Sequence, residues 1–366
     1  MPNIVFFIYN ITASGGTERV ASVIINELCR KGYNVHVLGL FGAPEAIFFP
    51  FDPAVRVTSL HIEDKKGIQK ILYSIGKIRQ FVTSNHIDTF ITVESIMATY
   101  SIPALAMTRI RHIVWEHFNF KVNLGIAARS FARQLALFFA DRIITLTNRD
   151  IKFWKEGAWF RRAELVHIAN PMFLELQHIP EKTSKTVISA GRITPQKGFD
   201  LLIDAWHEIS GELRNEWKLL IIGDGEDKKL LEKKIAALNL SDSVSLIGTT
   251  KDIFSYFQQA SVYCLSSRFE GLPMVLLEAL AFRLPIVAFD CDTGPEELIE
   301  DGKNGLLVEP GNVRKLSESL ARLMTDDALR QQMRLHKSDK LKPLNLTSII
   351  SQWQKVVEYT NYLVFL

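Results

Sequence analysis

The sequence predicts an α/β protein of two doubly wound domains, each with a parallel sheet covered by helices on both faces. Short runs rich in Val, Ile and Phe alternate with helical stretches, which is the pattern of such sheets. The alternation breaks near Asn170–Ser184, where "NPMFLELQHIPEKTS" is proline-bearing and ends in polar residues, as a linker does. A length of 366 residues also suits about two domains. We therefore expect one domain over residues 1–170 and a second over residues 171–346.

The elements of the first domain follow in order. Its predicted strands are "NIVFFIY", "NVHVLGL", "DTFITV", "RHIVWE" and "RIITL". Helical patterns separate them, such as Glu18–Lys31 and Lys66–Ser84. Ligands of such sheets bind beyond the carboxyl ends of the strands, so the loops after these runs are the places to search for a site.

The second domain repeats the pattern. Its predicted strands are "KTVISAG", "WKLLIIG", "SVSLIG", "SVYCLS", "PIVAF" and "GLLVEP". Leu316–Leu335 then has a helical pattern, and Thr347–Leu366 has an apolar one.

Composition narrows the possible functions. A net charge of +3 is too small to argue for a nucleic-acid partner. Cys29, Cys264 and Cys291 are scattered, which suggests neither a disulfide framework nor a metal cluster and fits a reducing compartment. The N-terminus lacks the basic start of a signal peptide, and no run approaches the roughly 20 apolar residues of a membrane span. A cytoplasmic protein is the expectation.

Three glycine-bearing loops follow predicted strands. "NITASGGTERV" opens a helix at Gly15 and Gly16, where free amides could meet an anion, although a plain tight turn explains it equally well. "SAGRITPQKG" places Arg192 and Lys197 before a helix, where a guanidinium fork and an ammonium would suit a diphosphate; two solvated surface charges are the alternative. "IIGDGED" repeats the geometry after the next strand, which makes coincidence less plausible.

Two glutamates eight positions apart raise a further question. Glu270 lies in a predicted loop, and Glu278 lies in an otherwise apolar helix that begins near Pro273. A buried carboxylate is costly unless it is paired. Glu278 could bind the adjacent hydroxyls of a ribose, with Glu270 and nearby backbone amides closer to whatever the diphosphate carries. A structural salt bridge at Glu278 is the alternative.

Four motifs of the chain resemble those of one family, the retaining glycosyltransferases of family 4 with the GT-B architecture. "EGLPMVLLE" is similar to its E-x7-E motif and "GRITPQKG" to its diphosphate loop. "SGGTERV" is similar to its N-terminal glycine loop, and "DTGPEELIEDGKNGLLVEPGN" to the segment after the E-x7-E motif. The resemblance spans nearly the whole chain. It implies two Rossmann-like domains facing each other across a cleft, with a helix at about 347–366 crossing back to the N-terminal domain.

The resemblance also implies site residues. The C-terminal domain would hold a nucleoside-diphosphate sugar, most commonly a UDP-sugar, and the N-terminal domain would hold the acceptor. Glu270 and His117 would act at the transferred sugar. The implied donor-binding residues are Gly16, Arg192, Lys197, Ile247, Gly271, Leu272, Met274 and Glu278. His117 follows a strand in "VWEHFNF", where a satisfied strand-end histidine is the alternative.

The implied chemistry is transfer with retention of the anomeric configuration, by front-face attack. Arg192, Lys197 and a helix N-terminus would oppose the charge that develops on the leaving diphosphate. No cofactor and no metal are expected to be required. "FDCD" offers Asp290 and Asp292 as a tempting metal pair, which we reject because no second ligand group is evident.

Other functions share this pattern. A nucleotide-sugar 2-epimerase has the same architecture and would need no acceptor. A sugar-nucleotide-binding subunit without activity is a third option, which the intact motif set disfavours. The acceptor implied by the resemblance to surface-polysaccharide enzymes is a saccharide on a polyprenyl diphosphate, and a soluble acceptor is the alternative.

One stretch of the first domain is strongly basic. Residues 109–162 hold eleven Lys or Arg and four Asp or Glu. Within it, "NLGIAARSFARQLALFFAD" predicts a helix in which Arg129 and Arg133 alternate with Phe131, Leu135 and Phe138. A basic helix that carries aromatic residues suits an anionic membrane surface. We therefore expect peripheral binding to the cytoplasmic face, with the arginines toward lipid; the alternative packs the apolar side on the sheet and leaves the arginines solvated.

Overall fold

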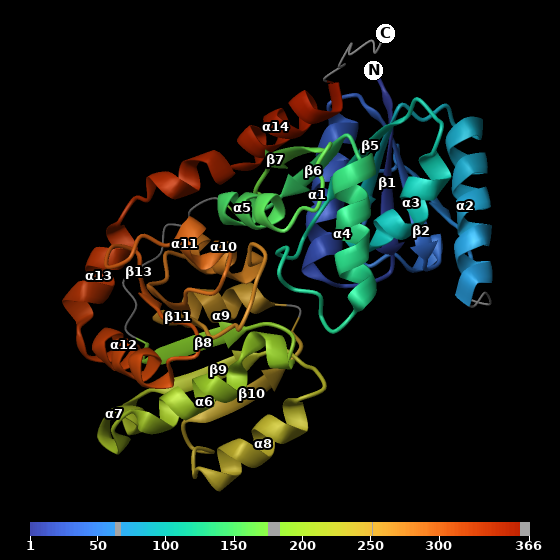
Figure 1. The fold of residues 1–366 in the computed structure, drawn as a ribbon. Coiled ribbons are helices and arrows are strands. Elements are labelled where there is room, and N and C mark those ends of the chain that lie inside the picture. The colour runs from blue at the N-terminus through green and yellow to red at the C-terminus, as the bar shows by residue number, and fades with distance from the viewer. Residues whose placement is uncertain (63–66, 175–183, 251, 359–366) are drawn as a thin grey trace. The chain divides into compact units, whose positions relative to one another are not determined.

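The computed structural model describes residues 1–62, 67–174, 184–250 and 252–358. Its contacts divide the chain into two compact units (Figure 1). Unit 1 is Met1–Pro171 together with the segment from Leu346 onward, and unit 2 is Met172–Asn345. The predicted linker Asn170–Ser184 lies largely outside the described residues.

Unit 1 contains a seven-stranded parallel sheet with the order β3-β2-β1-β4-β5-β6-β7. The strands are β1 (Asn3–Asn10), β2 (Asn34–Phe41), β3 (Arg56–Ser59), β4 (Thr89–Val93), β5 (Arg111–Trp115), β6 (Arg142–Thr145) and β7 (Glu164–His167). The five predicted strands are confirmed. The strands β3 and β7 were not predicted, because these short edge strands are only partly buried and so lack a continuous apolar run.

Helices cover both faces of this sheet (Figure 1). They are α1 (Gly16–Arg30), α2 (Gly67–Ser84), α3 (Ala98–Leu105), α4 (Ala127–Phe139), α5 (Asn148–Glu156) and α14 (Leu346–Glu358), with short 3-10 turns η1 (Pro44–Ala46) and η2 (Ser95–Met97). Alternate residues of each strand point to opposite faces, so Phe7 packs in the core with α2 and α3, whereas Phe6 contacts Trp353 of α14.

The helix α14 confirms the predicted return of the chain to the first domain. Trp353 is buried and lies 4.7 Å from Trp115 and 6.0 Å from Phe6, measured between ring centroids. Arg142 also donates to the backbone oxygen of Val356 at 3.1 Å. The part of the predicted helix beyond Glu358 lies outside the described residues.

Unit 2 contains a six-stranded parallel sheet with the order β10-β9-β8-β11-β12-β13. All six predicted strands are present: β8 (Thr186–Ala190), β9 (Lys218–Ile222), β10 (Val244–Gly248), β11 (Val262–Leu265), β12 (Ile286–Phe289) and β13 (Gly305–Val308). The helices are α6 (Phe199–Glu208), α7 (Gly211–Glu216), α8 (Lys228–Ala237), α9 (Ile253–Gln259), α10 (Met274–Ala281), α11 (Pro295–Leu298), α12 (Val313–Thr325) and α13 (Asp327–Leu335), with turns η3 (Pro195–Lys197) and η4 (Asp339–Leu344).

The predicted helix Leu316–Leu335 is in fact two helices. Asp326 separates α12 from α13, and its side chain accepts a hydrogen bond from the backbone nitrogen of Leu329 at 2.9 Å. A carboxylate in this position caps a helix N-terminus, so it starts a new helix where the apolar period alone suggested continuation.

Candidate functional site

In unit 2, the loops after β8 and β9 touch through their backbones. The nitrogen of Ile193 donates to the oxygen of Asp224 at 2.8 Å. A Cβ on Gly225 would lie 2.2 Å from the oxygen of Ile193, and a Cβ on Gly198 would lie 2.1 Å from the oxygen of Ser266. Gly198 also has a φ of +60°, which glycine adopts without strain. These glycines are therefore required for close packing of the loop that carries Arg192 and Lys197.

That loop brings Lys197 to the first of the two glutamates. The Nζ of Lys197 lies 2.6 Å from Oε1 of Glu270, and the hydroxyl of Ser267 donates to the same oxygen at 2.6 Å. Glu270 is buried and Lys197 is half-buried, so Lys197 is no simple surface charge. Arg192 is exposed on the same loop. The structure thus places an ammonium, a guanidinium and a carboxylate along one short loop and its neighbour.

The second glutamate lies close by. Glu278 is buried in α10. Burial raises the pKa of Tyr263 well above its ordinary value, and the carboxylates of Glu270 and Glu278 raise it further. Both glutamates therefore lie near the same phenol, beyond the carboxyl end of β11. The sequence predicts Glu270 in a loop and Glu278 in the helix that follows it, and the structure brings both carboxylates near Tyr263.

The segment after β12 supports the loop between the glutamates. Gly294 has a φ of +103°, and a Cβ there would lie 2.9 Å from the oxygen of Gly271. The hydroxyl of Thr293 donates to the backbone oxygen of Glu270. Leu272 is buried and Met274 begins α10. The "TGP" turn therefore fixes the backbone on which Glu270 is carried.

Ile247 lies at the carboxyl end of β10, where the strand is irregular. Pairing with β9 shifts register between Leu246 and Gly248, so Ile247 occupies a bulge and is half-buried. A bulge at a strand end frees backbone groups from the ladder, which suits contact with a ligand.

In unit 1, Gly16 begins α1 and is exposed, with Gly15 in an extended conformation before it. A Cβ on Gly15 would lie 2.5 Å from Oε2 of Glu18, so that carboxylate folds back over the loop. The first turn of α1 thus already faces a negative charge from its own helix.

His117 follows β5 and is buried against Trp115, with ring centroids 4.3 Å apart. Burial lowers its pKa to about 3, so its ring is neutral over the physiological range. Its Nε2 has no hydrogen-bond partner among the described residues. A buried neutral imidazole of this kind can exchange hydrogen bonds with a ligand and does not act there as a cation.

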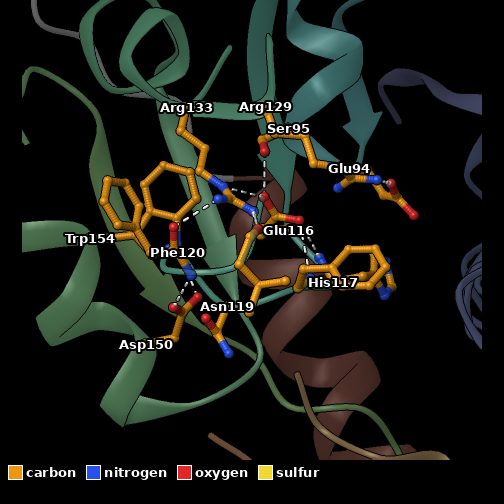
Figure 2. A network of polar contacts seen from close by, with 12 residues as sticks. Glu94, Ser95, Glu116, His117, Asn119, Phe120, Arg129, Arg133, Asp150 and Trp154 are labelled. Carbon is orange, nitrogen blue, oxygen red and sulfur yellow. Dashed lines mark hydrogen bonds and ion pairs between the residues drawn. The ribbon is translucent and has the colours of Figure 1, made fainter. Parts of the chain in front are cut away.

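Figure 2 shows a polar network that holds the loop of His117. The carboxylate of Glu116 accepts from the backbone nitrogens of His117 and Phe118 at 3.0 and 3.1 Å and from Nε of Arg133 at 3.2 Å. Arg133 also donates to the oxygens of Phe120 and Val122, each at 2.7 Å. Every guanidinium nitrogen of Arg133 is therefore used to fix this loop.

Asp150 of α5 completes the network. It accepts from the nitrogen of Phe120 at 2.7 Å and from Nε1 of Trp154 at 2.9 Å. Burial raises its pKa to about 7. The positioning roles of Glu116, Arg133 and Asp150 were not predicted from the sequence. An acidic residue directly after a buried strand, as in "VWEH", is the signal that points to Glu116.

The expectation that Arg129 and Arg133 face lipid is wrong, and so is the alternative that they are solvated. Their exposed fractions are 7% and 1%. Arg129 pairs with Glu94 at 3.1 Å, and Arg133 pairs with Glu116. The carboxylates of the half-buried Glu94 and the buried Glu116, at the ends of β4 and β5, draw the arginine side of α4 inward, which no local pattern on the helix itself reveals.

The exposed side of α4 is aromatic instead. Phe131, Phe138 and Phe139 are 57%, 46% and 49% exposed, and Trp159 and Phe160 of the loop between α5 and β7 are exposed as well. We call these five residues the aromatic face. Phe138 lies 5.0 Å from Phe160 between ring centroids. A groove of about 370 Å³ beside Phe131 and Trp159 continues this surface.

Among the described residues, no helix combines the length and apolar character that crossing a membrane requires.

Two family models match the chain. The model described as Glycosyltransferase Family 4 matches residues 14–176, and the model described as Glycosyl transferases group 1 matches residues 175–337. Together they extend over the loops described above and over every strand of the two sheets except β1.

Three relatives are similar to this chain over nearly their full length. An uncharacterized glycosyltransferase of Haemophilus influenzae is 34% identical over 363 residues, which cover 98% of this chain and 100% of that protein. The amylovoran biosynthesis glycosyltransferase AmsD of Erwinia amylovora is 28% identical, over 90% of this chain and 92% of its own. The GalNAc-alpha-(1->4)-GalNAc-alpha-(1->3)-diNAcBac-PP-undecaprenol alpha-1,4-N-acetyl-D-galactosaminyltransferase of Campylobacter jejuni is 25% identical, over 96% and 97%.

Solved structures share the fold. The lipopolysaccharide outer core galactosyltransferase WaaB in its apo form superposes with a TM-score of 0.77 at 20% identity, covering 97% of this chain and 99% of that one. HepE of Anabaena in complex with UDP-glucose superposes with a TM-score of 0.79 at 18% identity, over 97% and 99%.

Proposed function

The chain belongs to glycosyltransferase family 4 and has the GT-B fold, and from that premise we propose that it transfers a hexose or N-acetylhexosamine from a UDP-sugar, with retention, to a saccharide on a polyprenyl diphosphate. The observation that carries the donor half is the meeting of Lys197, Glu270 and Glu278 beyond the carboxyl ends of the unit 2 strands. The acceptor half is supported by the relatives in amylovoran synthesis and on PP-undecaprenol. Bacterial surface-polysaccharide assembly is the process that fits both.

Each donor-site residue then has a role in the proposal. Arg192 and Lys197 bind the diphosphate and oppose the charge that develops on it as the anomeric bond breaks. Glu278 accepts hydrogen bonds from the ribose hydroxyls. Glu270, held by Lys197 and Ser267, positions the transferred sugar together with the amides of Gly271, Leu272 and Met274.

Three further contacts belong to the same proposal. Backbone groups at Ile247, freed by the bulge in β10, read one edge of the base. The unpartnered Nε2 of His117 meets a hydroxyl of the transferred sugar. The exposed amide of Gly16 approaches the donor phosphate, in competition with the carboxylate of Glu18.

The charge stabilisation described here uses protein groups alone, so we propose that no metal and no cofactor is required.

A donor screen tests the proposal. UDP-glucose, UDP-galactose, UDP-N-acetylglucosamine and UDP-N-acetylgalactosamine are each incubated with and without a farnesyl-diphosphate-linked N-acetylgalactosamine, and UDP release and product anomer are measured. We expect acceptor-dependent UDP release with one donor and an α-linked product. Interconversion of free nucleotide sugars without acceptor would indicate an epimerase, and an inverted product would contradict retention.

Matched variants connect the screen to the site. Arg192→Gln should weaken UDP binding about tenfold, because it removes a charge-assisted contact. Lys185→Gln is the control, since Lys185 is also exposed in unit 2 but lies at the amino end of β8, whereas Arg192 follows the carboxyl end of the same strand. Equal UDP affinity of both variants and the parent would exclude Arg192 from the site.

We also propose that the protein binds the cytoplasmic face of the plasma membrane peripherally, through the aromatic face in place of the arginines of α4. The exposed Lys155, Arg161 and Arg162 flank this face. Aromatic side chains with a basic rim suit the interface of an anionic bilayer. A lipid-linked acceptor would then lie in the same membrane.

A further inference from the structure

Glu94 has a backbone conformation that its residue type disfavours. It directly follows β4 with a φ of +68°, a region that L side chains other than Asn and Asp seldom adopt. The position is fixed from outside, because the nitrogen of Glu94 donates to the oxygen of Trp115 at 2.8 Å and its carboxylate pairs with Arg129. Strain of this kind persists where the surrounding structure enforces it, and it is concentrated at functional sites.

Glu94 also lies at the point of the sheet where ligands bind. The strand order reverses between β1 and β4, because the chain first proceeds from β1 to β2 and β3 and then returns to the other side of β1. In doubly wound sheets, the crevice beyond the carboxyl ends of strands at such a reversal is the binding position. The residues next to it are Glu94 after β4 and the Gly15 loop after β1.

The two arginines of α4 differ in a way that points to a ligand. They lie one turn apart and both are buried, but Arg133 uses all three nitrogens within the protein. Nε and Nη1 of Arg129 have no partner among the described residues, and only Nη2 contacts Glu94. A buried guanidinium with two unused donors is costly, so its environment is incomplete as it stands.

The charges around Glu94 select the chemistry of the ligand. Burial raises the pKa of Glu94 to about 7; Arg129 lowers it, and the carboxylates of Glu116 and Glu18 raise it. Around Glu94 itself, three carboxyl groups outnumber the guanidinium groups of Arg129 and Arg133, so a phosphate directly beside Glu94 is disfavoured. The carboxylate can accept hydrogen bonds from a pair of neighbouring hydroxyls, and the guanidinium can donate its unused hydrogens to them; a pyranose presents such neighbouring hydroxyls.

We propose that Glu94 and Arg129 form the binding site for the hydroxyls of the acceptor saccharide, which deepens the proposed function and rests on it. Glu94 accepts hydrogen bonds from the sugar, and Arg129 orients Glu94 and donates to the same sugar. Phe118, over whose ring the Arg129 guanidinium lies at 4.8 Å, holds that guanidinium in place.

Acceptor kinetics test the site, with the farnesyl-diphosphate-linked N-acetylgalactosamine as the probe. Glu94→Gln keeps an oxygen for Arg129 and should raise the acceptor KM at least tenfold, with the donor KM and acceptor-independent UDP release unchanged within about twofold. Arg129→Lys should also raise the acceptor KM, because it keeps the charge and loses the extra donors. Glu164→Gln is the control, since Glu164 also pairs with a buried arginine, at 2.7 Å. It differs from Glu94 in its place, because it lies at the amino end of the edge strand β7.

A pH profile separates binding from a structural role. The acceptor KM of the parent should fall as pH rises from 6 to 8, because Glu94 then loses its proton and accepts more hydrogen bonds. Glu94→Gln should remove this dependence. An unchanged acceptor KM in Glu94→Gln, or the same pH profile, would overturn the inference.

Calorimetric binding of the acceptor probe, which needs no turnover, distinguishes failure of this inference from failure of the proposed function. If the parent transfers no sugar from any donor, the proposed function fails, and calorimetric binding of the acceptor probe still reports on Glu94. Tighter binding to the parent than to Glu94→Gln supports the inference. Equal binding, or none to the parent, contradicts it.

Discussion

At the residue scale, the ion pair of Lys197 with Glu270 gives the lysine two functions. It faces a diphosphate in the proposed complex, and it neutralises a buried carboxylate in the free protein. The pairing therefore predicts that this lysine contributes to stability as well as to ligand binding. Removing one partner of a buried pair leaves an uncompensated charge, which costs more than the pair itself contributes.

Lys197→Ala should thus lower both UDP affinity and stability. We expect affinity to fall about ten- to a hundredfold, since a charge-assisted contact contributes roughly 1.5–3 kcal/mol. The free energy of unfolding should fall toward the lower end of the roughly 3–5 kcal/mol typical of broken buried pairs, because Lys197 is partly solvated. Calorimetry with UDP and urea unfolding measure the two effects.

The double variant Lys197→Ala/Glu270→Gln separates them. It should recover much of the lost stability, because no carboxylate remains uncompensated, but none of the UDP affinity. Wild-type UDP affinity in Lys197→Ala would remove the lysine from the site.

The charged residues of this site could be predicted from the sequence, but the partners that they contact in the free protein could not. The glycines of "GRITPQKG" and the spacing of Glu270 and Glu278 are local patterns, and the structure brings these residues to one sheet edge. Pairing is different, because Lys197 and Glu270 are distant in sequence, as are Arg129 and Glu94. Long-range pairs of this kind depend on packing that no local pattern contains.

At the element scale, α4 shows how a correct helix can be assigned the wrong orientation. Arginines and phenylalanines alternate along it, so periodicity predicts two faces but not which of them faces the core. The carboxylates at the ends of β4 and β5 determine which face packs inward, because they pair with the arginines. The same limit explains β3 and β7, since edge strands are half-solvated and their residues do not form apolar runs.

The orientation of α4 changes the membrane prediction. Phe138→Ser/Phe160→Ser should abolish co-sedimentation with vesicles containing anionic lipid at low salt, because it removes two exposed rings from the aromatic face. Leu72→Ser is the control, since Leu72 is also exposed in unit 1 but lies on α2. If all three proteins sediment equally, or the parent does not sediment at low salt, the aromatic face does not bind lipid.

At the scale of the whole molecule, four titratable groups of unit 1, three of them buried and Glu94 half-buried, have opposing effects on stability in acid. Burial lowers the pKa of His112 and of His117 to about 3, so the unfolded chain binds their protons first and stability falls as pH falls below about 6.5. Burial raises the pKa of Glu94 and of Asp150 to about 7, so the folded chain binds those protons first and stability rises as pH falls from about 7. Between about pH 5 and 6.5 the four contributions nearly cancel.

His112→Asn should unbalance this arrangement. As the pH falls from 6 to 5, the unfolding free energy of the variant should rise by about 1.4 kcal/mol relative to that of the parent. The reason is that the variant lacks an imidazole whose protonation favours the unfolded chain. Urea unfolding at several pH values measures the difference. Above pH 7 the difference should be constant, reflecting only the lost hydrogen bonds to Thr92 and Ser101. A difference independent of pH throughout would show that His112 titrates alike in both states.

Unit 1 also depends on α14. Trp353→Ala should lower its unfolding free energy by about 3–5 kcal/mol, because the indole fills the space between Phe6 and Trp115. Lys355→Ala, an exposed position on the same helix, should change it by less than about 0.5 kcal/mol. Equal stability of the two variants would show that α14 contributes little to unit 1.

Because α14 packs in unit 1 yet follows unit 2 along the chain, the ribosome delivers all of unit 2 before unit 1 can be completed. At typical synthesis rates of 5–20 residues per second, the residues between Pro171 and Leu346 take roughly 9–35 s to emerge. During that time Phe6 and Trp115 lack the indole that covers them. Unit 2 can fold around its own core while the nascent unit 1 exposes an apolar surface that is open to aggregation until translation reaches Trp353.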